Sequence, residues 1–182
     1  MRLEVKERGS KEYYDEFLYV VSRHKKFKKN PRRKAYQFTK YLVFYNIFTF
    51  FVLLLNFYFY IDTKKTIFIF MTGALTLALM IQIVYLFVCR KRIKLLLKTK
   101  GVRIVEFNED GIEYIDDDKN IRVKWEDIKY IILNKYTICV LPKMIVNGFI
   151  SINGKYKDEI VDTLEKYNKI DMFIDNSHYY KK

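Results

Sequence analysis

Two long uncharged stretches, residues 41–61 and 66–89, constrain this chain more than any other feature of its sequence. Only residues 62–65 separate them. An α-helix rises about 1.5 Å per residue, so the first stretch alone reaches about 31 Å, and a bilayer hydrocarbon core is about 30 Å thick. The sequence therefore predicts a hairpin of two transmembrane helices.

The charge of the chain is divided unevenly along its length. Residues 1–100 carry a net charge of +15, and residues 101–182 a net charge of −2. Nine basic residues lie between positions 23 and 40 and seven between 90 and 103, and neither run contains Asp or Glu. The charged residues of the linker 62–65 are only two lysines and one aspartate. The positive-inside rule therefore predicts a multi-pass protein with both termini in the cytoplasm.

The segment before the hairpin is expected to hold a short strand within residues 2–8 and an amphipathic helix from residue 11 that ends at Asn30-Pro31. Two interpretations of its basic end have equal weight: a helix lying on anionic lipid headgroups, or a helix docked on the cytoplasmic domain with solvated lysines. The cations expected at the membrane surface are Lys25, Lys26, Lys28, Lys29, Arg32, Arg33, Lys34, Arg90, Lys91, Arg92 and Lys94.

A few polar and small residues interrupt the two apolar stretches. Asn46, Thr49 and Asn56 are expected to form hydrogen bonds across to Thr72, Thr76 or Gln82, because neutral intramembrane polar groups mostly hold helices together. Ala74 and Ala78 form a small-xxx-small pair next to Gly73, which predicts close packing. The tight four-residue linker favours packing within the hairpin, and packing with a second copy is the alternative. The residues assigned to helix packing are Asn46, Asn56, Gly73, Ala74 and Ala78.

After residue 101 the apolar periodicity changes from that of helices to the alternation typical of strands. Short apolar runs at 103–107, 111–115, 121–125, 128–133, 137–141 and 148–152 predict a small antiparallel sheet. An amphipathic helix over 156–167 is expected to cover its open side. The predicted layout is an N-terminal segment (1–34), a membrane hairpin (35–100), an α+β cytoplasmic domain (101–167) and a tail (168–182).

Two short segments of this domain supply a turn and a core anchor, respectively. Residues 105–112 read VEFNEDGI and residues 123–128 read VKWEDI. We expect Gly111 to take a positive φ in a turn, Trp125 to anchor the core and Ile128 to begin the next strand. In this order after a basic-flanked hairpin, the segments resemble the YcxB-like family of bacterial membrane proteins. The resemblance implies a pleckstrin-homology-like (PH-like) domain and a bacterial cytoplasmic membrane.

No constellation for a reaction is visible in the sequence. The two histidines are far apart, the two cysteines lack partners at metal-site spacing, and phosphate-binding glycine motifs are missing. The prediction is a non-enzymatic membrane protein without cofactor or metal, whose cytoplasmic domain binds or scaffolds. Its expected partners are anionic lipid and a protein partner or a second copy, not nucleic acid. The alternative is an immunity or stress-protection protein against a membrane-active toxin or bacteriocin.

Overall fold

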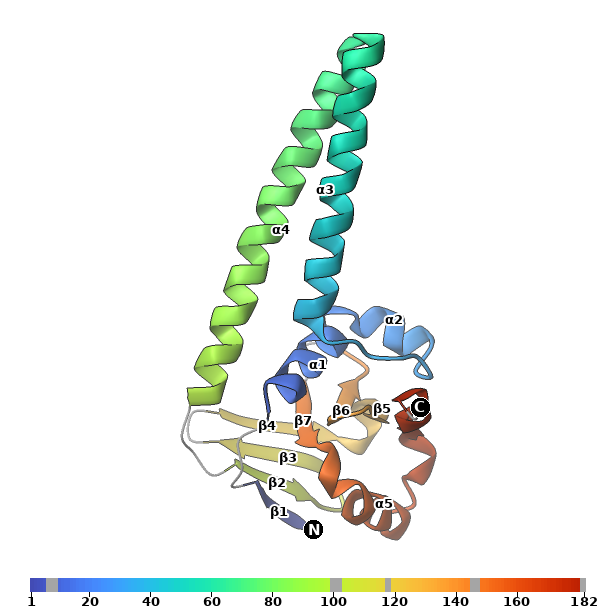
Figure 1. The fold of residues 1–182 in the computed structure, drawn as a ribbon. Coiled ribbons are helices and arrows are strands. Elements are labelled where there is room, and N and C mark those ends of the chain that lie inside the picture. The colour runs from blue at the N-terminus through green and yellow to red at the C-terminus, as the bar shows by residue number, and fades with distance from the viewer. Residues whose placement is uncertain (6–9, 99–102, 117–118, 145–147, 181–182) are drawn as a thin grey trace. The chain divides into compact units, whose positions relative to one another are not determined.

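The computed structural model describes residues 1–5, 10–98, 103–116, 119–144 and 148–180 (Figure 1). The chain divides into two compact units. The helical unit comprises Gln37–Leu96, and the sheet unit combines Met1–Tyr36 with Leu97–Lys182. The N-terminal segment, predicted to precede the hairpin as a separate region, therefore folds together with the C-terminal domain.

The helical unit is an antiparallel hairpin of α3 (Phe38–Thr63) and α4 (Thr66–Lys98). Their 26 and 33 residues correspond to about 39 Å and about 50 Å of helix. α3 ends where Lys64 takes a left-handed conformation with φ 52° and donates its N–H to the carbonyl of Tyr60. The predicted stretches 41–61 and 66–89 lie inside these helices, and both helices are long and apolar enough to cross a membrane.

The sheet unit contains two four-stranded sheets, where the sequence predicted one antiparallel sheet. The first has the order β1-β2-β3-β4, and the second the order β7-β6-β5-β8 with β8 parallel to β5. A 3₁₀ turn at Trp125–Asp127 separates β4 from β5 and so ends the first sheet. The strands are β1 (Arg2–Val5), β2 (Arg103–Phe107), β3 (Gly111–Asp116), β4 (Lys119–Lys124), β5 (Ile128–Leu133), β6 (Thr137–Pro142), β7 (Ile150–Asn153) and β8 (Phe173–Asp175).

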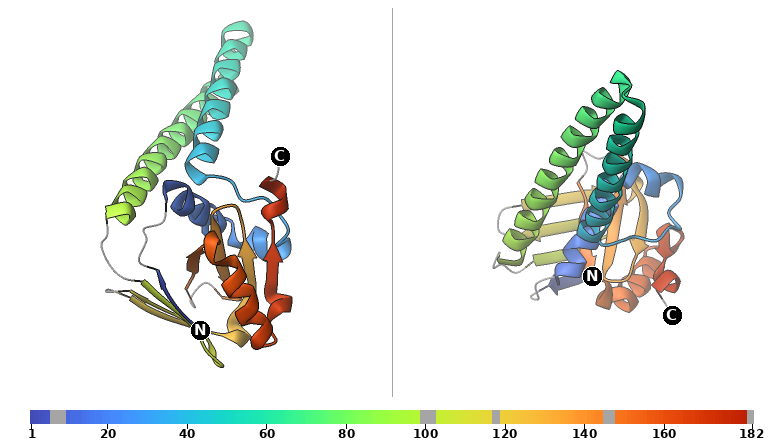
Figure 2. Two further views of the ribbon diagram at one scale, coloured as in Figure 1. Left: turned by 60° about the horizontal axis from the view of Figure 1, so that its bottom comes forward. Right: turned by 45° about the horizontal axis from the view of Figure 1, so that its top comes forward.

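One hydrophobic core joins the two sheets, whose strands Figure 2 shows in two further views. Val105 and Ile112 enter it from the first sheet and Ile138 and Val140 from the second. Helix α5 (Lys157–Lys166) closes the core with Ile160 and Leu164, both fully buried. The two sheets and the helix therefore share a single core, which no one of them could bury alone.

The N-terminal helices cover the other face of the second sheet. They are α1 (Lys11–Ser22) and α2 (His24–Lys29), and α1 lies against β6. All six residues of β6 are buried. Continuous burial of this kind is typical of a strand covered on both faces. The three- and four-residue spacing of the apolar residues of α1, Phe17 and Leu18 among them, predicts that they form its inward face. This prediction is wrong in part, because Phe17 and Leu18 are half-exposed while Glu16 is buried.

Residues 168–180, predicted to be a tail, add structure to the sheet unit. Asn168, with φ 53°, follows the end of α5, and β8 then pairs with the central strand β5. Further short 3₁₀ turns in the described part of the chain are Gly154–Tyr156, Ile170–Met172 and Ser177–Tyr180. The C-terminal residues therefore complete the second sheet.

Candidate functional site

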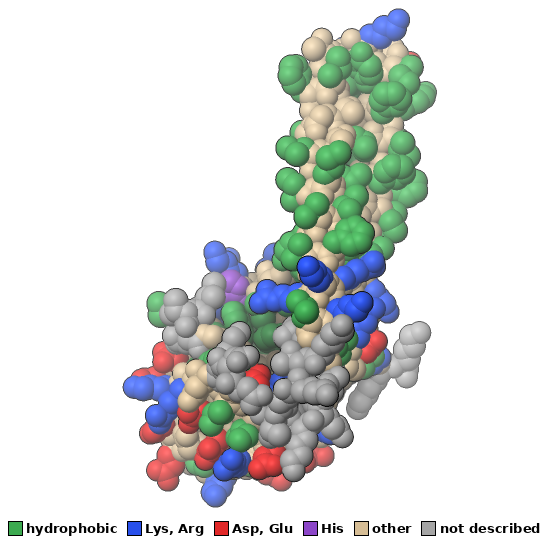
Figure 3. Space-filling view, turned by 90° about the vertical axis from the view of Figure 1, so that its left-hand side faces the viewer, with side chains coloured by type: hydrophobic (Ala, Val, Ile, Leu, Met, Phe, Trp, Pro, Cys, Tyr) green, Lys and Arg blue, Asp and Glu red, His purple; other side chains and the backbone are tan. Residues whose placement is uncertain are grey.

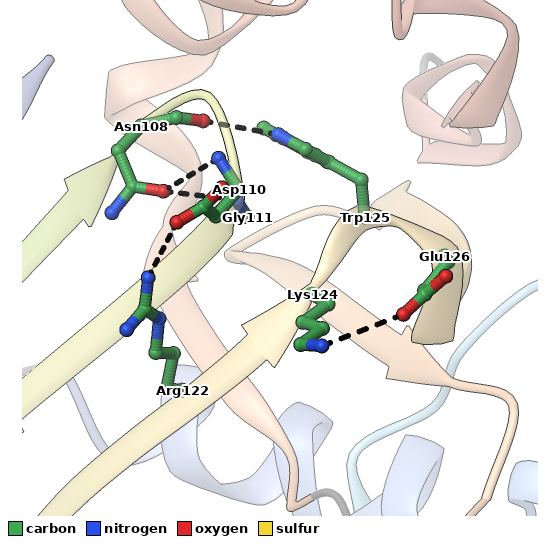
Figure 4. Close-up of polar contacts among 7 residues, drawn as sticks. All are labelled: Asn108, Asp110, Gly111, Arg122, Lys124, Trp125 and Glu126. Atoms are coloured by element: carbon green, nitrogen blue, oxygen red, sulfur yellow. Dashed lines mark hydrogen bonds and ion pairs between the residues drawn. The ribbon is translucent and has the colours of Figure 1, made fainter.

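A groove with a volume of about 740 Å³ opens on the sheet unit beside Trp125. Its lining residues come from the β2–β3 turn, from β4, from the 3₁₀ turn that follows β4 and from the segment after α5. They are Glu109, Asp110, Arg122, Lys124, Trp125, Glu126, Lys169 and Met172. Figure 4 shows the polar contacts that hold one side of this groove.

Trp125 is held by hydrogen bonds from both its backbone and its ring. Its indole Nε1–H donates to the carbonyl of Asn108 at 3.0 Å, and its backbone N–H donates to the carbonyl of Asp110 at 3.0 Å. The residue is 5% exposed, and its ring packs against those of Phe107 and Tyr167. Trp125 is therefore a core residue with an edge in the groove, as the sequence predicted for a core anchor, and Ile128 is buried just after it.

Gly111 is required for a different reason from the one predicted. The only described glycine with a positive φ is Gly148, so Gly111 does not use the left-handed conformation. A Cβ at Gly111 would lie 2.1 Å from the backbone oxygen of Val123 on the paired strand. Asn108 stabilises the turn before it, because its Oδ1 accepts the N–H groups of Asp110 and Gly111 (Figure 4). The glycine therefore permits close approach of two strands.

The charges around the groove neutralise one another. Arg122 pairs with Asp110 at 2.7 Å, and Lys124 faces Glu126 at 3.7 Å, with all four side chains more than half exposed. Exposed pairs of this kind contribute little stability. The groove lining has three acidic and three basic residues. Its electrostatics therefore favour neither an anionic nor a cationic ligand.

Two histidines and one cysteine of the described residues make packing contacts or are buried. The His24 ring packs edge-on against Phe149, and the His178 ring lies against Tyr179. Burial raises the pKa of the Cys139 thiol to about 12, so it is protonated at neutral pH. Among the described residues, no group of three or more His, Cys, Asp or Glu could hold a metal ion.

Glu16 is a buried acidic residue that the sequence did not predict. Its carboxylate accepts the backbone N–H groups of Lys135, Tyr136 and Thr137, at 3.3, 2.9 and 3.0 Å, and the Thr137 hydroxyl at 2.8 Å. Burial raises the pKa of Glu16 even though these hydrogen bonds oppose the shift. The residue joins α1 to the turn between β5 and β6, and the hydropathy pattern of α1 gives no sign of it.

The basic segment before α3 is fixed by the C-terminal residues. The buried Asn176 donates its Nδ2 hydrogens to the carbonyls of Pro31 and Arg33. The Tyr180 hydroxyl accepts the N–H of Ala35 at 3.0 Å, and it donates to the carbonyl of the same residue at 2.8 Å. This contact set, called here the juxtamembrane clamp, orders the backbone of residues 31–35.

The predicted membrane-surface cations lie on both units. On α2, Lys25, Lys26 and Lys29 are exposed and Lys28 is half-buried. In the clamped segment Arg32 and Lys34 are exposed and Arg33 is half-buried. Those of the helical unit, Arg90, Lys91, Arg92 and Lys94, are all exposed on α4. Nine of the eleven predicted cations are therefore exposed. The half-buried Lys28 donates from its ammonium to the carbonyl of Lys143.

The helical unit has a polar seam and an apolar exterior. Asn56 donates to the Thr72 hydroxyl at 2.7 Å and to the carbonyl of Phe68 at 3.0 Å, and the Thr49 hydroxyl lies 3.4 Å from Gln82 Oε1. These are two of the cross-helix contacts expected from the sequence. Asn46 instead donates to the carbonyl of Leu42 in its own helix.

The positions at the seam recur at alternating spacings of three and four residues, as in antiparallel helix pairs packed with a small crossing angle. On α3 they are Leu42, Asn46, Thr49, Leu53, Asn56 and Tyr60. On α4 they are Phe68, Thr72, Leu75, Leu79, Gln82 and Leu86. Large apolar side chains cover the outside, among them Phe44, Phe70 and Phe87, at 69%, 75% and 67% exposed (Figure 3).

The small residues of α4 lie mostly outside the seam. Gly73 and Ala74 are exposed and Ala78 is half-exposed. A Cβ built on Gly73 would meet no atom within 4 Å. Close packing at Gly73 and Ala74 is therefore not part of the contact between α3 and α4.

Comparison of the chain with family models, with curated proteins and with solved structures found no match. The resemblance to the YcxB-like family therefore stays a prediction from the sequence.

Proposed function

We propose that this chain is a non-enzymatic integral protein of a bacterial cytoplasmic membrane. In this proposal α3 and α4 cross the bilayer, and the sheet unit is held at the inner leaflet as a binding or scaffolding module. One observation carries the proposal: the helical unit is apolar outside and polar at its seam. In water this distribution would expose large aromatic and aliphatic surfaces, whereas lipid solvates them and leaves the polar groups to pair inside.

The inferred orientation follows from the flanking charges. The tip of the hairpin holds Asp62, Lys64 and Lys65, whereas the opposite flanks are strongly basic and free of acidic residues in sequence. The positive-inside rule places such flanks in the cytoplasm. The chain continues from both basic flanks into the sheet unit, so the sheet unit is cytoplasmic in this proposal.

A PH-like character of the sheet unit is the second part of the proposal. Its support is the layout of two sheets around a common core with a helix after the last antiparallel strand. The groove beside Trp125 is a surface on which such a module could receive a partner, but its balanced charges do not specify the partner. Fold alone does not assign a ligand.

The test combines extraction with single-cysteine labelling in cells, in a background with Cys89→Ala and Cys139→Ala. The protein is expected to stay in the membrane pellet after alkaline carbonate treatment. A membrane-impermeant maleimide is expected to label Lys65→Cys in intact cells, and the exposed Asp158→Cys of α5 only after permeabilisation. Release by carbonate would refute membrane insertion, and the reverse labelling pattern would refute the orientation.

A further inference from the structure

A cationic corner of the sheet unit joins α2 to the end of β6. Lys28 donates from its ammonium to the carbonyl of Lys143, directly after β6, and the His24 ring packs against the Phe149 ring at 6.0 Å. Lys143 and Met144 are both exposed, Met144 at 63%. Two segments far apart in sequence thus meet at this corner, where Lys143 and Met144 are exposed next to the contact with α2.

Packing and hydrogen bonds hold the backbone that presents these lysines. Phe27 is fully buried and packs edge-on against Tyr19 at 6.3 Å, so the lysines on either side of it in α2 project from an anchored helix. The juxtamembrane clamp orders the next residues, where Arg32 and Lys34 are exposed. Lysines held on an ordered backbone lose less conformational entropy on binding than lysines of a loose tail.

The corner is predominantly cationic, with Asp127 as an acidic neighbour whose backbone carbonyl accepts the N–H of Lys143 at 2.7 Å. Residues 23–40 contain nine cations and no acidic residue, and residues 128–157 contain five lysines and no acidic residue. Ion pairs between described residues engage cations of β2, β4 and α5, and none of those pairs uses Lys25, Lys26 or Lys29. A partner with several negative charges over a broad area therefore fits this corner.

We propose that the corner formed by Lys25, Lys26, Lys29, Lys143 and Met144 binds the anionic headgroups of the membrane in which the hairpin sits. Only residues 30–37 separate α2 from α3, so α2 stays within about 30 Å of chain from the first membrane helix. Lysines contact phosphate at the headgroup level and Met144 enters the apolar boundary below it. Nucleic acid would satisfy the lysines but offers no apolar layer to Met144.

The inference rests on the proposed membrane insertion of α3 and α4, and the experiment separates the two. The full-length Cys89→Ala, Cys139→Ala chain is reconstituted in vesicles of phosphatidylcholine with or without phosphatidylglycerol. An environment-sensitive dye is attached at Met144→Cys or, as the control, at the exposed Glu165→Cys. Glu165 lies on α5, which Figure 1 places at the other end of the sheet unit. Flotation and carbonate resistance of the same samples report hairpin insertion.

The dye at position 144 is expected to shift to the blue and to lose quenching by iodide when phosphatidylglycerol is present, while the dye at 165 stays water-like. Changing Lys25, Lys26 and Lys29 to Gln should lower the ratio of lipid-bound to water-exposed dye by about fivefold for each lysine removed. The control Lys166→Gln, on α5, should leave it unchanged. Unaltered Trp125 emission shows that each variant is folded.

Three outcomes overturn the inference. An inserted protein whose 144 dye stays in water, or responds equally to both vesicle types, refutes the lipid contact and leaves the membrane proposal standing. A 144 dye that responds to added RNA and not to phosphatidylglycerol assigns the corner to nucleic acid. A protein that fails to float with the vesicles refutes the membrane proposal itself, and the lipid contact with it.

Discussion

Glu16 shows how a single buried residue can decide the packing of a helix. The turn between β5 and β6 leaves three backbone N–H groups and a hydroxyl pointing at α1, and buried donors must find acceptors. A carboxylate is the side chain that can accept several such bonds at once. Glu16 therefore lies inward, although the apolar pattern of α1 favours a neighbouring face.

Replacing Glu16 is expected to destabilise the sheet unit. Glu16→Ala leaves the three amides without an acceptor and should lower the free energy of unfolding by about 3 kcal/mol. Trp125, the one tryptophan of the chain, lies in the same unit, so its emission during urea unfolding of the purified protein in detergent measures the change. Glu12→Ala, in the first turn of the same helix, is the comparison variant. Equal stability of Glu16→Ala and the parent would contradict this role.

The same residue gives a pH dependence with a defined sign. Burial raises the pKa of Glu16 in the folded protein above its ordinary 4.5, so the folded state binds this proton more tightly than the unfolded state. The contribution of this proton binding to the stability of the folded state is fully present below the ordinary pKa of 4.5. It is lost as the pH rises through the raised pKa of Glu16 in the folded protein. The stability advantage of the parent over Glu16→Gln should therefore shrink as pH increases above 4.5. Urea midpoints over a pH series test this, and an advantage that grows with pH would contradict it.

At the scale of elements, the contact between α3 and α4 depends on few polar pairs. Asn56→Leu removes the bonds to Thr72 and to the carbonyl of Phe68, and should weaken helix association by about 1 kcal/mol. Asn46→Leu is the matched control, because Asn46 bonds only within its own helix and its Oδ1 is buried without a partner. Thermal loss of helical circular dichroism in detergent compares them. A larger loss for Asn46→Leu would contradict the assignment.

The juxtamembrane clamp is the second element-scale feature. Asn176→Ala removes two hydrogen bonds to residues 31–33 and should increase local opening of that segment about tenfold. Trypsin cleavage after Arg32, Arg33 or Lys34 reports the opening. Tyr179→Phe loses one exposed bond to the carbonyl of Arg32 and should have a smaller effect. Unchanged cleavage of Asn176→Ala would show that the clamp does not order this segment.

At the scale of the whole molecule, the two units are stabilised by different interactions. The sheet unit depends on a hydrophobic core formed by residues from both ends of the chain, whereas α3 and α4 satisfy their backbone hydrogen bonds internally. In detergent, urea should therefore unfold the sheet unit first. We expect the Trp125 emission change to precede the loss of far-ultraviolet helical signal, giving two separate midpoints. One shared midpoint would show that the units unfold together.

The sequence alone determined the features that depend on local patterns. Two uncharged stretches specify two long helices, since their length and apolarity are properties of adjacent residues, and alternating residues located β2 and β5 at the observed bounds. The cross-helix partners of Thr49 and Asn56 also followed, because few polar residues face each other in the hairpin.

Only the tertiary structure decided the features that depend on residues distant in sequence. The close approach of Val123 requires glycine at position 111. The hydrogen-bond donors of the β5–β6 turn bind the carboxylate of Glu16, which therefore lies inward. The edge of β5 pairs with residues 173–175 near the C-terminus. In each case the conformation of the residue depends on a contact with a residue more than ten positions away in the sequence. Hydropathy and periodicity describe residues that are neighbours along the chain, so they do not reveal contacts between residues distant in sequence.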